Sequence, residues 1–144
     1  MKTKKNPKIE TKDELGNING YLVPIYNIHD SFHDEGNEPQ QVYLTVVKKG
    51  TVKGPHLHYI RTGMFSCIKG NVKIIVKEKN EYKKYFSGEN HNFSSIIVPA
   101  GIPAMVQNIG DEDAFLLNMP SPAWTPEMND EHTADFSDFV DDDK

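Results

Sequence analysis

The amino-acid sequence predicts an all-β protein built as an antiparallel sandwich or barrel, and three observations lead to this prediction. Between residues 20 and 126, short runs rich in Val, Ile, Tyr and Phe alternate with turn signals. No segment of that region carries the long apolar period of 3.6 residues that an amphipathic helix needs. The turn signals recur about every ten residues, a spacing typical of a sandwich or barrel of roughly nine strands.

Each predicted strand is a short run that ends at residues favouring turns, mainly Gly, Asn, Asp and Pro. Many runs alternate apolar with polar residues, so one face of each strand is expected to be buried. In chain order, the predicted strands are 20–26, 41–47, 56–60, 64–68, 71–77, 81–86, 94–99, 104–109 and 114–119.

The 144 residues fit a single domain with three parts. We expect an N-terminal arm over 1–19, a β-barrel over 20–126 and an acidic C-terminal tail over 127–144. The tail holds two Phe and one Val among its acids, so part of it can dock, for example as a short helix. Otherwise the tail is expected to be solvated, with its last four residues frayed.

Charge is distributed unevenly along the chain. The net charge is −5, with +2 on residues 1–14, −7 on residues 127–144 and a balanced middle. A neutral body with an acidic tail lacks the basic face that binds a phosphate backbone. We therefore expect no nucleic-acid partner.

Cysteine content and hydropathy indicate the compartment. Cys67 is the single cysteine, so no intramolecular disulfide can form and a reducing compartment is expected. The N-terminal residues lack the apolar stretch of a secretory signal. The longest apolar run, 96–106, is interrupted by Pro and Gly and is too short to cross a bilayer. We expect a cytoplasmic protein with no membrane partner.

A pair of histidines lies at a recognisable spacing near the middle of the chain. Gly50, His56, His58 and Gly70 match the first cupin motif, in which a glycine precedes His-x-His and a second glycine follows a carboxylate. Gly63 stands where that motif has its carboxylate. The chain therefore resembles the cupin family, and the resemblance implies a single-domain antiparallel jelly roll.

A second cupin motif follows farther along the chain. Pro99, Gly101 and Asn108 match its proline, glycine and asparagine, whereas Ala104 stands where it has a histidine. Together the two matches cover residues 50–108. A cupin metal site takes ligands from both motifs, so the loss of two of the four predicts a barrel without a metal or other cofactor.

His56 and His58 are expected to point to the same side, because alternate residues of a strand share a face. Without a metal, two imidazoles with an ordinary pKa near 6.5 can serve as general acid and base. The alternative is that they only satisfy polar groups in a barrel that has lost its chemistry. His29 and His33 would bind a metal only if their loop were helical, and its Asp, Gly and Pro residues favour a solvated loop.

The residues around the histidines narrow the resemblance. Residues 42–58 look like the strand-turn-strand of RmlC-like cupins that act on nucleotide-linked 4-keto-6-deoxy sugars. These are the dTDP-4-dehydrorhamnose 3,5-epimerases and the dTDP-4-keto-6-deoxyglucose 3,4-ketoisomerases. Lys53 to His56 matches the Arg-Gly-x-His segment of the epimerases, with Lys for Arg. In the ketoisomerases the segment continues to a second histidine, the counterpart of His58, and a catalytic tyrosine lies about where Tyr43 stands.

The end of the barrel departs from the epimerases. They carry a late catalytic tyrosine in a Tyr-x-Pro segment, where this chain has Trp124. An indole N–H only donates a hydrogen bond, so it cannot replace a phenol as the second proton donor of a 3,5-epimerase. Residues 109–124 also resemble the C-terminal cupin of capsular-polysaccharide enzymes, which keep the metal ligands that this chain lacks.

The resemblance implies a catalytic group of three residues. His56 would abstract the proton alpha to the sugar ketone. His58 or Tyr43 would stabilise the enolate oxygen and return a proton. Tyr43 serves equally well as a core residue, because it shares a strand face with Thr45 and Val47.

Four more residues are predicted substrate contacts. Lys53 and Arg61 would hold the pyrophosphate, although each fits a plain surface charge as well. Trp124 would stack on the base or sugar, or else seal the end of the barrel. Asn108, from the second motif, completes the set.

The predicted function is a metal-independent isomerase or epimerase of a dTDP- or UDP-linked keto sugar in polysaccharide or glycan biosynthesis. The alternative from another class is a non-catalytic cupin that binds a sugar or a sugar nucleotide. A homodimer is expected, because small sandwiches expose sheet edges and the strand at 20–26 can swap onto a partner.

Overall fold

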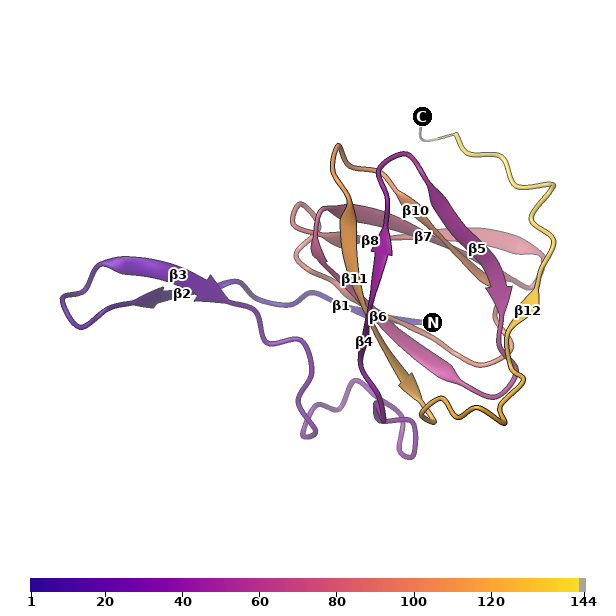
Figure 1. The fold of residues 1–144 in the computed structure, drawn as a ribbon, viewed down its shortest axis with the longest axis horizontal. Helices are drawn as coiled ribbons and strands as arrows, with labels where there is room; N and C mark the ends of the chain where they lie inside the picture. Colours follow the sequence, from indigo (N-terminus) through magenta and orange to yellow (C-terminus); the bar gives the residue numbers. More distant parts are fainter. Residues whose placement is uncertain (143–144) are drawn as a thin grey trace.

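Two five-stranded antiparallel sheets pack face to face in the computed structural model of the protein, which describes residues 1–142 (Figure 1). The first sheet has the strand order β1-β9-β6-β11-β4, and the second has the order β12-β5-β10-β7-β8. A separate two-stranded hairpin, β2-β3, stands outside both. This arrangement is the predicted antiparallel jelly roll. The predicted fraying of the last four residues falls partly outside the described residues.

The strands are short, as the turn spacing predicts. No helix long and apolar enough to cross a membrane occurs in the described residues. The strands are β1 (Lys2–Lys4), β2 (Ile9–Lys12), β3 (Ile18–Leu22), β4 (Tyr43–Val47), β5 (Val52–Leu57), β6 (Thr62–Lys69), β7 (Asn71–Glu78), β8 (Glu81–Gly88), β9 (Ser95–Val98), β10 (Ala104–Asn108), β11 (Ala114–Ser121) and β12 (His132–Thr133).

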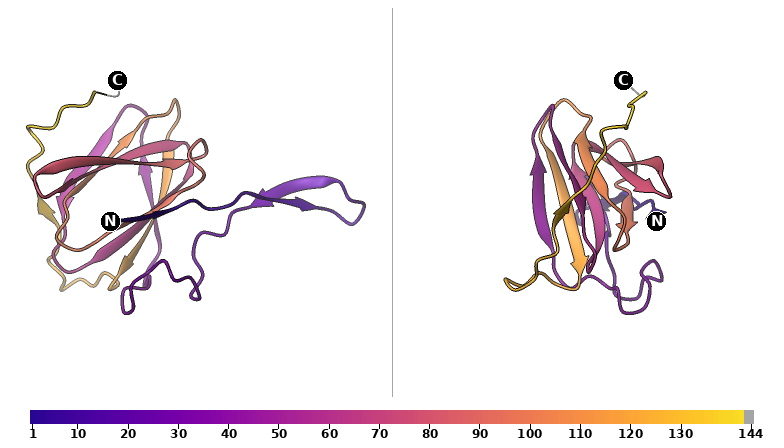
Figure 2. Two further views of the ribbon diagram at one scale, coloured as in Figure 1. Left: turned by 180° about the vertical axis from the view of Figure 1, so that it is seen from behind. Right: turned by 90° about the vertical axis from the view of Figure 1, so that its right-hand side faces the viewer.

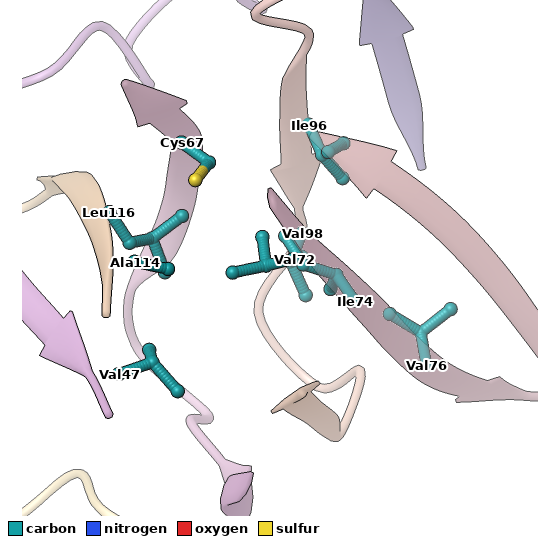
Figure 3. Packing of buried hydrophobic residues seen from close by; sticks show 9 residues of the cluster. All are labelled: Val47, Cys67, Val72, Ile74, Val76, Ile96, Val98, Ala114 and Leu116. Carbon is teal, nitrogen blue, oxygen red and sulfur yellow. The ribbon is translucent and has the colours of Figure 1, made fainter. Parts of the chain in front are cut away.

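The core lies between the two sheets and is built from alternate residues of each strand. Val72, Ile74 and Val76 of β7 are fully buried and face residues of the opposite sheet such as Val47 and Leu116 (Figure 3). These β-branched and aliphatic side chains fit the pleated surface of a strand.

The N-terminal arm differs from its prediction. It contains β1, which pairs with β9, and β2, which pairs with β3. The strand predicted over 20–26 is β3, at 18–22, and Pro24 follows it. The buried Asn6 side chain donates to the Phe93 carbonyl and the Ser95 hydroxyl, at 2.6 and 2.7 Å. The arm is therefore anchored, while the hairpin projects far from the barrel (Figures 1 and 2).

Part of the C-terminal tail docks on the barrel, as predicted, but it does so without the suggested helix. Its residues before 143 form no helix; they contain β12, which pairs with β5, and farther on they contact Tyr82 of β8 and Lys73 of β7. Phe136 is buried edge-on against Tyr82, at 5.1 Å between ring centroids. Asp141 forms a 2.7 Å ion pair with Lys73, whose side chain is 3% exposed. Aromatic packing and charge pairing thus hold a segment that composition alone marks as solvated.

The segment before the histidines also differs from its prediction. The strand predicted over 56–60 is β5, which begins at Val52 and ends at Leu57. The strand therefore begins before Gly54 and Pro55, where it pairs with β10 at Val52 and Lys53, and at its end it also pairs with β12. Residues 59–61 are instead the turn into β6.

Candidate active site

One end of the barrel holds a cavity of about 250 Å³. Both polar and apolar side chains line it, a mixture typical of small-molecule sites. The residues that line it are Tyr43, Thr45, Lys53, His56, His58, Arg61, Gly63, Phe65, Val98, Pro99, Ile102, Ala104, Val106, Leu116, Asn118 and Glu131.

The three predicted catalytic residues meet in this cavity. His56 and His58 lie at the end of β5, with the half-buried Leu57 between them, and both line the cavity as strand alternation predicts. Tyr43 begins β4 on the opposite sheet, and its side chain is also half-buried in the cavity wall. The fold therefore brings together two imidazoles and a phenol from strands of different sheets.

The surroundings of His58 favour its neutral form. Burial lowers the pKa of His58 below 6.5, and the charge of Arg61 lowers it further. The carboxylates of Asp130 and Glu131 act in the opposite direction but do not overcome these effects. A neutral imidazole can accept a proton at one nitrogen and donate one from the other.

Two carboxylates that sequence analysis missed come from the C-terminal tail. An oxygen of Glu131 lies 3.4 Å from Nδ1 of His56. Asp130 is 5% exposed, and its carboxylate accepts hydrogen bonds from the backbone N–H groups of Tyr59, Ile60 and Arg61 at 2.8, 2.9 and 3.0 Å. No local pattern marks either residue, because both lie among other acids about seventy residues from their partners in the chain.

Arg61 provides a positive charge at the cavity mouth. Its guanidinium lies 5.9 Å from the centre of the Tyr43 ring, within the range of a cation–π contact. No described carboxylate lies within 4.0 Å of that guanidinium, whereas the Asp130 carboxylate is bonded to backbone. Lys53 lies on β5, is exposed and also lines the cavity. The two predicted pyrophosphate contacts are thus both present at the site.

A second hollow of about 410 Å³ adjoins the cavity and shares Tyr43, His58, Arg61 and Glu131 with it. Trp124 lines this outer hollow and is 57% exposed. Its backbone N–H donates to the side chain of Gln41 at 2.8 Å, which ties the residue to the segment before β4. A tryptophan so exposed does not seal the barrel, and its ring is accessible from the hollow.

Asn108 is the predicted substrate contact that lines neither the cavity nor the outer hollow. Its side chain is buried in the turn after β10, where Nδ2 donates to the carbonyls of Val47 and Glu112 at 2.9 and 2.8 Å. Its Oδ1 accepts the N–H of Gly110 at 2.8 Å. The predicted substrate contact is therefore corrected to a structural role, because every polar atom of the side chain is used in holding the turn.

The two positions that lack cupin ligands both line the cavity. Ala104 lies opposite His56 in the pairing of β10 with β5. At Gly63 an added Cβ would come within 3.0 Å of the Phe65 ring, so the ring occupies the space beside that position. Among the described residues, no group of three or more His, Cys, Asp or Glu side chains is arranged to hold a metal ion.

The other pair of histidines, His29 and His33, does not come together in the fold. His29 is exposed in a loop of turns, while His33 packs edge-on against Tyr26 and Phe32 at 5.2 and 5.5 Å. The loop is not helical, so the two imidazoles do not form the i, i+4 pair that a metal would need.

Comparison with known families gives one match that spans nearly the whole chain. The model of the family described as FdtA, WxcM-like, C-terminal, matches residues 9–143. No curated protein sequence matches this chain.

Solved structures give many matches at low sequence identity. A dTDP sugar isomerase from Desulfovibrio desulfuricans G20 superposes with a TM-score of 0.73 at 14% identity, covering 92% of this chain and 83% of that chain. ChmJ, a 3'-monoepimerase from Streptomyces bikiniensis solved with dTDP-quinovose, gives 0.72 at 17% identity, covering 94% and 70%. A histidine-to-asparagine variant of the 3,4-ketoisomerase QdtA from Thermoanaerobacterium thermosaccharolyticum, solved with TDP-4-keto-6-deoxyglucose, gives 0.67 at 20% identity, covering 92% and 86%. The likeness confirms the predicted cupin jelly roll.

Proposed function

This chain belongs to the FdtA family of WxcM-like C-terminal domains, and from that premise we propose that it is an isomerase or epimerase of a nucleotide-linked 4-keto-6-deoxy sugar. The observation that carries the proposal is the meeting of His56, His58 and Tyr43 in one cavity beside Arg61. Acid–base groups beside a cation with no described carboxylate partner suit a keto sugar that bears a pyrophosphate. The three structural neighbours named above, each a sugar isomerase or epimerase by its description, support the same class.

The first step is removal of a proton from the carbon next to the sugar ketone. His56 accepts this proton on an imidazole nitrogen, and the electron pair of the broken C–H bond moves into the adjoining C–C bond. The carbonyl oxygen then carries the negative charge of an enolate. Glu131, 3.4 Å from Nδ1 of His56, stabilises the positive charge that the imidazole acquires.

The second step is stabilisation and reprotonation of the enolate. Tyr43 or His58 donates a hydrogen bond to the enolate oxygen, where the charge develops. One of these groups then returns a proton. Return to the opposite face of the same carbon inverts a stereocentre, whereas transfer that ends on the neighbouring carbon moves the ketone. The atoms balance in both cases, and no redox cofactor is needed.

The nucleotide lies across the mouth of the cavity in this proposal. Arg61 and Lys53 contact the pyrophosphate, because guanidinium and ammonium groups donate hydrogen bonds to phosphate oxygens. The ring of Trp124 in the adjoining hollow stacks on the base. A dTDP- or UDP-linked sugar fits this division, in which the nucleotide stays outside and the sugar enters the barrel. Such enzymes serve polysaccharide or glycan biosynthesis.

Solvent exchange tests the chemistry directly. The protein is incubated in D₂O with dTDP- and UDP-linked 4-keto-6-deoxy sugars, and deuterium at C3 and C5 is followed by NMR. His56→Asn should slow the exchange by about 10² to 10⁴, the usual contribution of a general base. His91→Asn, the same change outside the cavity, is the matched control and should exchange like the parent. If His56→Asn exchanges as fast as the parent, His56 is not the general base. If the parent exchanges deuterium into none of the sugars, the alternative of a non-catalytic sugar-nucleotide-binding cupin is favoured.

We also infer that the protein is a homodimer. Strand β4 is an edge of its sheet, and its outward residues Leu44 and Val46 are 51% and 40% exposed. The projecting hairpin carries exposed Ile9, Tyr21 and Leu22. An open strand edge with apolar neighbours invites pairing with another chain, and the hairpin of a second copy offers matching apolar residues.

A further inference from the structure

Among the described residues that line the cavity, Asn118 has a buried side-chain oxygen without a hydrogen-bond partner. Asn118 is 5% exposed, and its side-chain oxygen Oδ1 makes no hydrogen bond to any described residue. Asn118 lies on β11 and lines the cavity. Leaving a buried acceptor unpaired is costly, and such atoms in native proteins often mark a site where a ligand or a bound water completes the bond.

The neighbours of Asn118 place this atom beside the proposed chemistry. Asn118 is the register partner of Tyr43 in the pairing of β11 with β4, so their side chains lie on the same face of the sheet. A Cβ built on Gly63 would lie 3.8 Å from Oδ1 of Asn118. Because Gly63 has no side chain, it offers no side-chain donor to Oδ1 of Asn118.

Asn108 shows what a structural asparagine looks like in this fold. Its Oδ1 and Nδ2 make three hydrogen bonds to backbone groups, at 2.8 to 2.9 Å. The Oδ1 of Asn118 makes none, although both residues are nearly fully buried. An apolar residue in the place of Asn118 would remove the unpaired acceptor, so the asparagine is not explained by stability.

We propose that Asn118 is a specificity-determining residue whose Oδ1 accepts a hydrogen bond from a hydroxyl group of the sugar ring. The inference rests on the proposed function, because it takes the sugar of a nucleotide sugar as the occupant of the cavity. It assigns one polar contact to the interior of the barrel, where the other lining groups near Asn118 are aromatic, aliphatic or hydroxyl side chains. Buried groups of this kind reject substrate analogues that lack the matching hydroxyl.

Binding of TDP and of TDP-4-keto-6-deoxyglucose separates a sugar contact from a nucleotide contact. Asn118→Leu keeps the branched shape and the number of side-chain heavy atoms, and it removes the acceptor. We expect its Kd for TDP to stay within about twofold of the parent and its Kd for the TDP-sugar to rise roughly five- to tenfold, the usual value of one hydrogen bond. Asn118→Asp keeps an acceptor oxygen and should recover part of that loss. A set of TDP-sugars that each lack one hydroxyl identifies the contact. The analogue without the hydroxyl that contacts Asn118 should have the same Kd for the parent and for Asn118→Leu.

Thermal unfolding supplies a readout that a structural role would not give. Asn118→Leu should have an unchanged or higher Tm, because it removes an unpaired buried acceptor. Asn108→Leu is the matched control, and its Tm should fall because three backbone hydrogen bonds are lost. Equal losses of Tm in the two variants would contradict the proposal.

The binding outcomes also separate this inference from the proposed function. Equal weakening of TDP and TDP-sugar in Asn118→Leu, or no weakening of either, would overturn the role of Asn118. If the parent binds the TDP-sugar but exchanges no deuterium, the proposed catalysis is wrong. The Kd values of the parent and Asn118→Leu still test whether Asn118 contacts the sugar. A parent that binds neither these compounds nor UDP and the UDP-linked sugar overturns both proposals.

Discussion

The carboxylate of Asp130 accepts the backbone N–H of Arg61 at 3.0 Å, while the guanidinium of the same arginine lies over the ring of Tyr43. The tail thus fixes the backbone of a residue whose side chain faces the site. The same carboxylate holds the two preceding N–H groups of the turn, which begins one residue after His58. The C-terminal tail is therefore part of the site architecture.

Asp130→Asn should weaken the binding of TDP about tenfold, a change of about 1.4 kcal/mol. The amide cannot accept all three N–H groups as a carboxylate does, so the turn that carries Arg61 shifts. Isothermal titration with TDP measures the effect. Asp135→Asn, in the exposed part of the same tail, is the matched control and should bind normally. If Asp130→Asn weakens TDP binding by the same factor in the parent and in Arg61→Gln, then Asp130 does not act through Arg61.

The same carboxylate gives the stability an acid dependence. Burial acts to raise the pKa of Asp130, but the three N–H bonds outweigh it and hold the pKa below 3.8. A pKa lower in the folded than in the unfolded chain stabilises the protein above about pH 4, and the contribution is lost as the pH falls through the folded value. Urea unfolding at pH 7 and pH 3 should show a larger difference between parent and Asp130→Asn at pH 7. Equal differences at both values would contradict this assignment.

His58 should titrate below its ordinary pKa of 6.5, because burial and Arg61 both disfavour its charged form. Arg61→Gln should raise the pKa of His58, and Glu131→Gln should lower it further. NMR of the imidazole C–H signals measures each value. Since the folded pKa is depressed, the contribution of His58 to the free energy of unfolding is complete above about pH 6.5 and falls as the pH drops. A His58 pKa above 6.5 in the parent would be the contrary result.

Phe136→Ala should lower the free energy of unfolding by roughly 1–3 kcal/mol, because the ring is buried against Tyr82. Val140→Ala, at a position 77% exposed, should change it little. Chemical denaturation gives both values. If the tail were solvated, neither substitution would change the free energy of unfolding.

Leu44→Lys together with Val46→Lys should convert the proposed dimer to a monomer, because two charges at an edge strand oppose pairing. Light scattering of the parent at micromolar concentration should give twice the 16.3 kDa of one chain, and the variant should give that mass itself. The substitution of two exposed Lys residues by Gln, at Lys79 in the turn before β8 and at Lys83 on β8, is a control that should leave the dimer intact. A parent that scatters as a single chain would exclude the dimer.

Local patterns in the sequence predict an antiparallel sandwich or barrel, and the resemblance to cupins adds the jelly roll and the histidine pair of the candidate site. Alternation along each strand defines which side chains face the core, and it brings His56 and His58 to one side. The spacing of glycines and prolines gives the turns between most strands. β1, β2 and the first half of β5 escaped prediction, because they are polar and short or contain Gly and Pro. Strand pairing, and not composition, gives these segments their structure.

What the sequence determined by itself is a property of neighbours along the chain: strand faces, turn positions and the His-x-His pair. Only the tertiary structure decided which distant residues join them. It draws Asp130 and Glu131 from an acidic tail to the turn after β5 and to His56. It turns Asn118 into the cavity unpaired and buries Asn108, which belongs to a motif, in a turn outside it. The physical reason is that side-chain periodicity acts over a few residues, whereas these contacts depend on sheet register and on a tail that docks across the barrel.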